Sequence, residues 1–199
     1  MIVIVDTGGA NLASLRYAFD RLNQKAKVSQ DPNEIQNAKA VILPGVGHAS
    51  HVMKKIETLG LIKIIQNLAQ PVLGICLGMQ ILFEESEESI DKMNTPGLGI
   101  LPGKVIALKP SKYTTVPHMG WNKVKSITHN ALLDSPTEFY FVHSYFISET
   151  AHTVSVCSYG ENKISAIVNK NNFWGTQFHP ERSGLSGSLL LKQFIKAAL

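Results

Sequence analysis

The residue with the clearest potential for chemistry is Cys76, which lies between two glycines in the segment Gly74-Ile-Cys-Leu-Gly78. An apolar run over 72–75 precedes the cysteine, and an apolar, helix-favouring stretch over 79–83 follows it. This is the pattern of a nucleophile elbow, in which the chain turns sharply from a buried strand into a helix. Small flanking residues let the two backbones pass close together and leave the nucleophile at the C-terminal edge of a sheet. The pattern therefore predicts a cysteine nucleophile.

The expected position of Cys76 near a helix N-terminus adds an electrostatic argument. Backbone N–H groups and the helix dipole at such a turn favour both a thiolate and an oxyanion. A free cysteine is nevertheless most often a small buried hydrophobic residue. The elbow alone leaves that alternative open.

A thiol nucleophile needs a base and a group that orients the base. Of the seven histidines, His179 stands out because it follows the apolar segment 173–178 and precedes Pro180-Glu181. Proline favours an extended local backbone, so His179 and Glu181 are expected to point to the same side. The carboxylate can then accept a hydrogen bond from the imidazole and set its tautomer. A surface pair without chemistry is the alternative, and distance in sequence from Cys76 is no objection.

Composition places the chain among compact, single-domain enzymes. It has 199 residues, of which 44% are apolar and 17% charged, which is enough to bury a full core. The net charge of +4 is mild and the lysines are scattered, which argues against nucleic-acid binding. We expect residues 1–199 to form one domain.

The cysteines and the absence of targeting signals indicate a cytoplasmic location. Cys76 and Cys157 are too few for a disulfide framework, and a reduced compartment would suit a catalytic thiol. The opening 1–6 segment is too short and lacks the basic start of a signal peptide. No apolar run approaches membrane-spanning length. We expect no membrane partner, no cofactor and no metal.

Strand and helix signals alternate through the first 85 residues. Asp31-Pro-Asn-Glu34 predicts a helix start with an N-cap, a proline in the first turn and a capping-box partner. The alternation predicts a mostly parallel α/β sheet, with ligands beyond the C-terminal ends of the strands. The expected strands lie at 2–5, around Val28, at 40–43 and at 72–75, and helical spacing marks 12–22, 52–56 and 61–68.

The second half of the chain has a different texture. An acidic segment from Glu84 to Asp91 is typical of a solvated loop. The pieces after it predict antiparallel strands, and a final helix over 189–198 should pack back on the sheet. The expected fold is thus an α/β domain with a mixed, mostly parallel central sheet flanked by helices and antiparallel strands in the second half. The later strands are expected at 105–108, 122–125, 139–142, 153–157, 164–168 and 173–177.

At this point the residues resemble a known family. The segments 74–80 and Gln177-Phe-His-Pro-Glu181 together resemble the class I, triad-type glutamine amidotransferases, which have a flavodoxin-like fold. Further motifs narrow the resemblance to the glutaminase subunits of imidazole glycerol phosphate synthase, and it covers essentially the whole chain. These motifs are Pro44-Gly-Val-Gly47, Phe83-Glu-Glu-Ser-Glu-Glu88, Pro117-His-Met-Gly-Trp-Asn122 and Phe141-Val-His-Ser-Tyr145.

The resemblance implies a reaction. Cys76 would attack the side-chain carboxamide of glutamine, His179 would move the protons, and Glu181 would orient His179. The oxyanion would be held by the Leu77 N–H and by a second N–H from the 45–47 loop. The remaining residues implied to bind substrate are Gly45, Val46, Gly47, Gln80, Glu88, His143, Ser144 and Tyr145.

The resemblance also implies a partner. A cyclase subunit with a (β/α)8 barrel would form a heterodimer with this chain and receive the ammonia. It would make imidazole glycerol phosphate and an aminoimidazole carboxamide ribonucleotide, a step of histidine biosynthesis. The family's glutaminase is weak until the cyclase binds its nucleotide. We expect the control to lie in the 44–47 loop, where glycines on both sides of Val46 permit a peptide flip.

Two segments depart from the family pattern. The chain has Asp6-Thr-Gly-Gly-Ala-Asn-Leu12, with Ala10 where a glycine is common. Arg182 follows the triad glutamate where lysine is frequent, which keeps the charge but changes the geometry. Asn11, Trp121 and Arg182 are expected at the partner interface, with a core position as the alternative for the tryptophan.

Other functions remain open. The chain could be a glutaminase subunit of another synthase, a γ-glutamyl hydrolase or cysteine peptidase of the same fold, or a non-catalytic scaffold. Gln80 and Glu88, suited to a free amino acid, argue against the peptidase. The intact Cys76, His179 and Glu181 argue against the scaffold.

Overall fold

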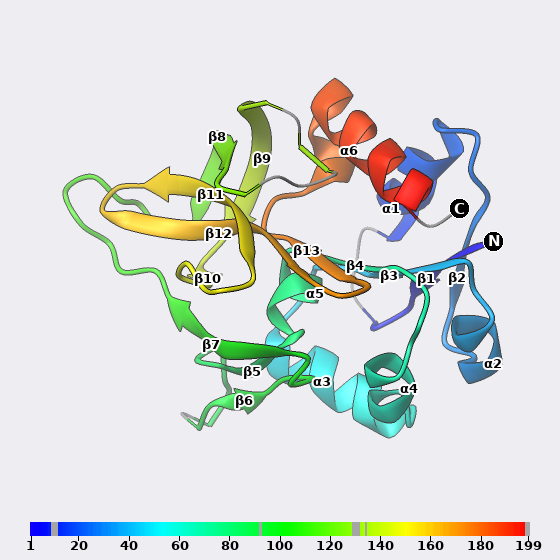
Figure 1. Cartoon of the computed structure of the whole chain (residues 1–199). Coiled ribbons are helices and arrows are strands. Elements are labelled where there is room, and N and C mark those ends of the chain that lie inside the picture. Colours follow the sequence, from blue (N-terminus) through cyan, green and yellow to red (C-terminus); the bar gives the residue numbers. More distant parts are fainter. Residues whose placement is uncertain (9–11, 92, 129–131, 134, 198–199) are drawn as a thin grey trace.

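A mixed sheet forms the centre of the computed structural model, which describes residues 1–8, 12–91, 93–128, 132–133 and 135–197 (Figure 1). Within these residues the sheet has nine strands in the order β2-β1-β3-β4-β13-β12-β11-β8-β9. The strands from β2 to β13 are parallel and the strands from β13 to β9 are antiparallel. The predicted change from parallel to antiparallel pairing is therefore confirmed.

The strands of this sheet agree with the apolar runs of the sequence. Those of the parallel part are short, and all except the edge strand β2 are largely buried, because helices cover both faces. They are β1 (Ile2–Val5), β2 (Ala26–Ser29), β3 (Ala40–Leu43), β4 (Val72–Ile75) and β13 (Phe173–Thr176). The antiparallel strands are β8 (His118–Ser126), β9 (Thr137–His143), β11 (Thr153–Tyr159) and β12 (Asn162–Lys170).

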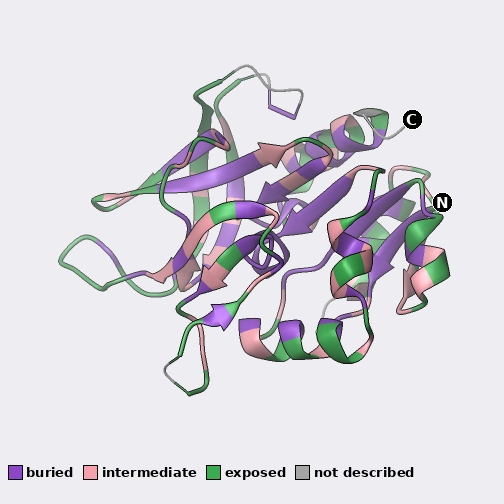
Figure 2. Cartoon of the chain, turned by 60° about the horizontal axis from the view of Figure 1, so that its bottom comes forward, coloured by how far each residue is buried: buried purple, intermediate pink, exposed green. Residues whose placement is uncertain are grey.

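Helices cover the two faces of the parallel part (Figure 1). On one face α1 (Leu12–Asp20) and α6 (Gly184–Ala197) pack against a buried cluster that includes Ile2 and Ile4. On the other face α3 (Ala49–Thr58) and α4 (Ile62–Gln66) pack against a cluster that includes Val3 and Val5. The alternate residues of one strand thus supply both cores, and the central strands are buried (Figure 2).

A smaller sheet follows the nucleophile and corrects two expectations. It consists of β10 (Tyr145–Phe146), β7 (Leu101–Ala107), β5 (Phe83–Ser86) and β6 (Thr95–Pro96) in the described part of the chain. The helix α5 (Leu77–Gln80) has only 4 residues, because Phe83 already pairs with Leu101. The segment after Glu84 was expected to be a solvated loop, but it begins as a strand.

The acidic side chains of this segment are used locally rather than left to solvent. Glu84 accepts a hydrogen bond from the Gly103 N–H at 2.9 Å. Glu87 accepts one from the Ala107 N–H at 2.9 Å and also pairs with Lys104. That backbone hydrogen bond is the main reason why the pKa of Glu87 lies below its usual value. The carboxylates thus pair β5 and its continuation to β7.

Two helix starts also differ from expectation. In α2 (Pro32–Gln36), Asp31 caps the helix by accepting from the N–H groups of Asn33 and Glu34. The Glu34 side chain does not return to Asp31 as in a capping box, because it pairs with Lys27 and Ser29. The last helix, α6, begins at Gly184 rather than at 189, because glycine and serine in its first turn hide the helical pattern.

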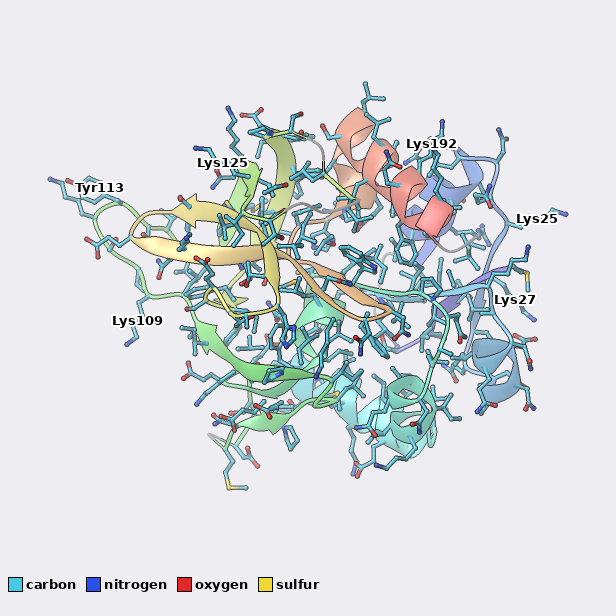
Figure 3. All side chains as sticks on the ribbon, in the orientation of Figure 1. Lys25, Lys27, Lys109, Tyr113, Lys125 and Lys192 are labelled. Atoms are coloured by element: carbon cyan, nitrogen blue, oxygen red, sulfur yellow. The ribbon has the colours of Figure 1, made fainter. Side chains whose placement is uncertain are left out.

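The lysine side chains that Figure 3 labels lie on more than one side of the molecule, with Lys25 and Lys27 close together on one of them. The side chains of Lys25, Lys109 and Lys192 point outward on different sides of the molecule (Figure 3). None of the described helices combines the length and the apolar character needed to cross a membrane.

Candidate active site

The strand pairing brings the two chemical motifs together. β4 and β13 are parallel neighbours, with Gly74 opposite Gly175 and Ile75 opposite Thr176. The backbone N–H of Cys76 donates to the Thr176 carbonyl at 2.6 Å. Cys76 and the segment that begins at 177 therefore leave the sheet side by side, although about 100 residues separate them in sequence.

Cys76 occupies a strained turn. It has φ 51° and ψ −107° between β4 and α5, a backbone conformation that L residues rarely adopt. A Cβ on Gly74 would lie 2.4 Å from the Gly78 carbonyl oxygen, and one on Gly78 would lie 2.0 Å from that of Leu43. The glycines thus permit the close backbone passage that the sequence predicted.

His179 and Glu181 are in contact. His179 Nδ1 lies 2.8 Å from Glu181 Oε1, and both side chains are buried. The backbone does not reach this geometry as expected, because 180–182 form a short 3-10 helix rather than an extended segment. Since Nδ1–H donates to the carboxylate, Nε2 is left for the hydrogen bond that His179 makes with Cys76.

A serine holds the histidine segment in place. Ser183 Oγ donates to the His179 carbonyl at 2.7 Å and accepts from the Tyr140 N–H at 2.9 Å. The His179 N–H in turn donates to the Tyr140 carbonyl at 2.9 Å. These three hydrogen bonds fix the position of the imidazole relative to β9.

The electrostatics favour a charged imidazole. Burial lowers the pKa of His179, but the Cys76 thiolate charge and hydrogen bonds to Cys76 and Glu181 outweigh it and raise the pKa to about 10. An imidazolium beside a thiolate is the form of the pair that is ready for nucleophilic attack.

A pocket of about 370 Å³ opens over Cys76. Its volume is in the range that holds a small metabolite. All of the residues that the sequence predicted for substrate binding line it, together with Cys76 and His179. The lining residues are Gly45, Val46, Gly47, Cys76, Leu77, Gln80, Glu88, Pro117, Val142, His143, Ser144, Tyr145, His179 and Arg182.

Polar groups converge on this pocket from several elements. Gln80 on α5 donates through Nε2 to the Tyr145 carbonyl at 2.7 Å. Glu88 accepts from the Ala49 N–H at 2.7 Å through Oε2. Such carboxylate and amide groups are suited to the charged end of an amino acid.

The loop 44–47, which is expected to supply an oxyanion N–H, lies against the elbow. A Cβ on Gly45 would lie 1.7 Å from the Ile75 carbonyl oxygen, whereas one on Gly47, at φ +117°, would meet only Val52 at 3.7 Å. The two glycines therefore serve different purposes. Gly45 lets the loop backbone pack closely against the elbow, whereas Gly47 gives the loop backbone its conformational freedom. The Leu77 N–H donates to no group among the described residues and is available to a ligand oxygen.

A pair of histidines underlies the far wall. His143 Nδ1–H donates to the Tyr145 carbonyl at 2.8 Å, so its Nε2 accepts from His118 Nδ1 at 2.9 Å. Asn122 completes the chain by donating to His118 Nε2 at 3.3 Å. Burial lowers the pKa of His118 to about 4, and burial with the nearby His118 lowers that of His143 to about 3. Both rings are neutral.

The predicted interface residues fall in different places. Trp121 is 56% exposed and packs edge-on against Tyr140, so the core alternative for this tryptophan is wrong. Arg182 is exposed at the mouth of the pocket. Asn11 lies outside the described residues.

Sequence reasoning missed two contributors, His118 and Gln177. Gln177 is fully buried, and its side-chain amide lies 3.6 Å from Cys76 Sγ. Its place in the Gln177-Phe-His-Pro-Glu181 segment was the signal that the sequence offered. Among the described residues no cluster of three or more His, Cys, Asp or Glu side chains could hold a metal.

Comparison with known proteins agrees with this geometry. The family model described as glutamine amidotransferase class-I matches residues 3–198. The chain is 48% identical over 198 residues to the imidazole glycerol phosphate synthase subunit HisH of Haemophilus influenzae, covering 98% of this chain and 96% of that protein. It is 46% identical over 197 residues to subunit HisH 2 of Campylobacter jejuni, covering 98% and 97%.

Solved structures show the same fold at lower identity. A crystal structure of a glutamine amidotransferase matches with a TM-score of 0.75 and 17% identity, covering 100% of this chain and 99% of that one. The glutaminase domain of Trypanosoma brucei CTPS matches with a TM-score of 0.67 and 16% identity, covering 99% and 92%. The chain belongs to the class I glutamine amidotransferases and, within them, to the family of imidazole glycerol phosphate synthase HisH subunits.

Proposed function

We propose that this chain hydrolyses glutamine to glutamate and ammonia and delivers the ammonia to a cyclase subunit of imidazole glycerol phosphate synthase in histidine biosynthesis. The observation that carries the proposal is the line from Cys76 through His179 to Glu181 at the floor of a pocket of metabolite size. The relatives named as subunits of that synthase supply the choice of pathway.

The first half of the reaction forms a thioester. The Cys76 thiolate attacks the side-chain carbonyl carbon of glutamine, and the carbonyl oxygen takes up the negative charge. The Leu77 N–H and an N–H of the 45–47 loop stabilise this oxyanion. His179 gives its Nε2 proton to the nitrogen, the carbon–nitrogen bond breaks, and ammonia leaves.

The second half regenerates the enzyme. His179, now neutral, takes a proton from water, and the resulting hydroxide attacks the thioester carbon. The carbon–sulfur bond breaks, glutamate leaves, and the thiolate returns. Glu181 keeps the Nδ1 proton of His179 in place through both halves, so that Nε2 is always the nitrogen that exchanges protons.

The other pocket residues select a free amino acid. We assign Glu88 to binding the substrate's ammonium group and Gln80 to binding the polar amino-acid end of the substrate, because both side chains line the pocket. Ser144 and Tyr145 close the opposite wall, where His143 holds the Tyr145 carbonyl. An extended peptide would have no ammonium group to pair with Glu88.

The partner surface is proposed beside the pocket mouth. Met119 and Trp121 lie on one side of β8 and are 66% and 56% exposed. The Trp121 ring contacts Tyr140, whose backbone is bonded to His179 and Ser183. Large exposed apolar side chains of this kind are typical of interface anchors. A (β/α)8 cyclase seated here would contact the segment that carries the catalytic histidine.

A thiol-reactive glutamine analogue tests the catalytic part of the proposal. We expect one equivalent of label on Cys76, protection by glutamine, and no label on Cys76→Ser. The matched control is Cys157→Ser, which removes the other cysteine, whose thiol pKa burial raises to about 12. Absence of labelling, or cleavage of peptide substrates by the same protein, would contradict the assignment.

A further inference from the structure

Gln177 is a fully buried glutamine between the end of β13 and His179. Its backbone N–H donates to the Ala166 carbonyl at 2.9 Å, which fixes the residue just beyond the C-terminal end of β13. Its side chain turns towards the nucleophile, with Nε2 at 3.6 Å from Cys76 Sγ. This distance is within the range of an N–H hydrogen bond to sulfur, which is longer than one to oxygen.

The neighbouring groups decide which end of the Gln177 amide faces the sulfur. Gln80 Nε2 must be a donor, because it lies 2.7 Å from the Tyr145 carbonyl, which can only accept. Gln80 Nε2 also lies 3.1 Å from the Gln177 amide, so the atom that it meets there is the oxygen Oε1. The nitrogen of Gln177 therefore faces Cys76, and its N–H points at Sγ.

The sulfur has a second contact that changes with its charge. As a thiol, Cys76 can donate S–H towards the Val142 carbonyl at 3.7 Å. As a thiolate it has no proton to donate and can only accept, and the Gln177 N–H is a donor already in position. The low-dielectric surroundings of a buried site strengthen a hydrogen bond to a charged acceptor.

We infer that Gln177 is a catalytic residue whose side-chain amide stabilises the Cys76 thiolate and, through Gln80, links the nucleophile to the wall that binds substrate. This inference rests on the proposed function, since it assumes that Cys76 is the nucleophile. Gln80 donates hydrogen bonds both to the Tyr145 carbonyl and to Gln177 Oε1. The hydrogen bond at Oε1 polarises the Gln177 amide, and this strengthens the hydrogen bond that the Gln177 N–H donates to the sulfur.

The pH dependence of alkylation by iodoacetamide measures the thiolate without using glutamine. In the wild type we expect fast alkylation of Cys76, and the pH dependence of its rate gives the reference midpoint. In Gln177→Leu, which keeps the volume but removes the donor, the midpoint should rise by about one pH unit, with about a tenfold lower rate below it, as expected for a lost hydrogen bond to a charged group. The pH midpoint of the thiolate's ultraviolet absorbance should shift by the same amount.

A matched control separates this effect from the general loss of a glutamine amide. Gln66 donates through Nε2 to the Leu98 carbonyl at 2.7 Å, away from the site. Gln66→Leu should leave the alkylation midpoint where it is in the wild type. Gln177→Asn, which keeps an amide on a shorter side chain, should recover part of the rate, whereas a merely space-filling role would favour leucine.

A measurement on the unmutated protein covers the case in which Gln177→Leu does not fold. With glutamine side chains labelled with ¹⁵N, one amide signal should follow the same midpoint as the thiolate absorbance and should shift when Cys76 is alkylated. If no amide signal follows the thiolate, or if the folded Gln177→Leu keeps the wild-type midpoint, the inference is wrong. If the wild-type cysteine itself alkylates slowly, the proposed function fails instead.

Discussion

Glu88 Oε2 accepts a hydrogen bond from the backbone N–H of Ala49 at 2.7 Å. Ala49 is the first residue of α3 and follows the 44–47 loop by two positions. The N-cap residue of this helix, His48, makes no side-chain cap. A carboxylate of the substrate pocket therefore also caps the helix that begins at this loop. Its other oxygen, Oε1, is the one that we propose to bind the substrate.

Substitutions at Glu88 should separate these two roles. In Glu88→Gln the amide oxygen can still accept from Ala49, but the charge that attracts the substrate's ammonium group is lost. We expect KM for glutamine to rise at least tenfold with little change in kcat. Glu88→Ala also releases the loop, so kcat should fall as well, by about tenfold, and the helix should lose about 1 kcal/mol of stability.

Steady-state kinetics and denaturant unfolding of the two variants check this prediction. Glu57→Ala, on the exposed side of the same helix, is the control and should change neither KM nor kcat. Equal kcat values for Glu88→Gln and Glu88→Ala would show that the Ala49 contact has no part in catalysis.

The orienting role of Glu181 gives a second prediction. Glu181→Gln removes the charge that helps to raise the pKa of His179 and permits the wrong tautomer, because an amide nitrogen can face Nδ1. By comparison with other triads we expect kcat to fall by about 10²-fold to 10⁴-fold, with folding retained. Glu161→Gln, on an exposed turn, is the matched control. A loss of less than threefold would contradict the role of Glu181.

The neutral histidine pair predicts how stability depends on pH. The folded protein keeps His118 and His143 neutral down to pKa values of about 4 and 3, against 6.5 for a free imidazole. The unfolded chain therefore binds more protons between these values, so the free energy of unfolding should fall as the pH drops from 6.5 towards 4. The slope from His143 alone approaches about 1.4 kcal/mol per pH unit.

Denaturant unfolding at pH 7 and pH 5 measures this slope. His143→Gln should be less stable than the wild type at pH 7 but should lose less stability on acidification. Val124→Ala, at a buried residue of β8, is a control that lowers stability without removing a titratable group. Parallel pH dependences for the wild type and His143→Gln would contradict the assignment of neutral rings.

The two loop glycines predict different effects of the same substitution. Gly45→Ala would place a Cβ 1.7 Å from the Ile75 carbonyl oxygen, so the backbone must move and stability should fall by about 2 kcal/mol or more. Gly47→Ala meets only the Val52 side chain, at an ordinary contact distance of 3.7 Å, but has φ +117°, so it should cost about 1–2 kcal/mol while restricting the loop.

Activity with and without a cyclase subunit and its nucleotide distinguishes the two glycines further. Gly47→Ala should lose a larger fraction of the activation by the partner than of its free energy of unfolding. If Gly47→Ala retained full activation, the peptide flip at this position would be excluded as the control step. Thermal unfolding of both variants in the absence of the partner completes the comparison.

The sequence predicted the parallel half of the sheet well, for a physical reason. Buried parallel strands are continuous apolar runs, and the chemistry lies where such runs end, as at Cys76 and His179. The sequence did not show that β4 pairs with β13. This pairing alone brings the C-terminal ends of the two strands together. The family resemblance supplied that link.

The expectations that failed concern segments where side chains, not periodicity, decide the structure. Glu84, in β5, and Glu87, just after it, are held against the small sheet because they accept backbone hydrogen bonds from β7 or the residue that ends it. Glu34 forms no capping box with Asp31, because its side chain pairs with Lys27 and Ser29 instead. Gln177 was missed because a buried amide has no periodic signature and its partner is distant in sequence.

Glutamate release from glutamine is the most direct test of the central claim. It should be measured for this chain alone, then with a cyclase subunit of imidazole glycerol phosphate synthase, and then with the cyclase and its nucleotide ligand. The account predicts weak release alone and a large rise when both are present, abolished by Cys76→Ser and reduced by Trp121→Ala. Strong release that is indifferent to the cyclase would contradict the partner and the site of control proposed here.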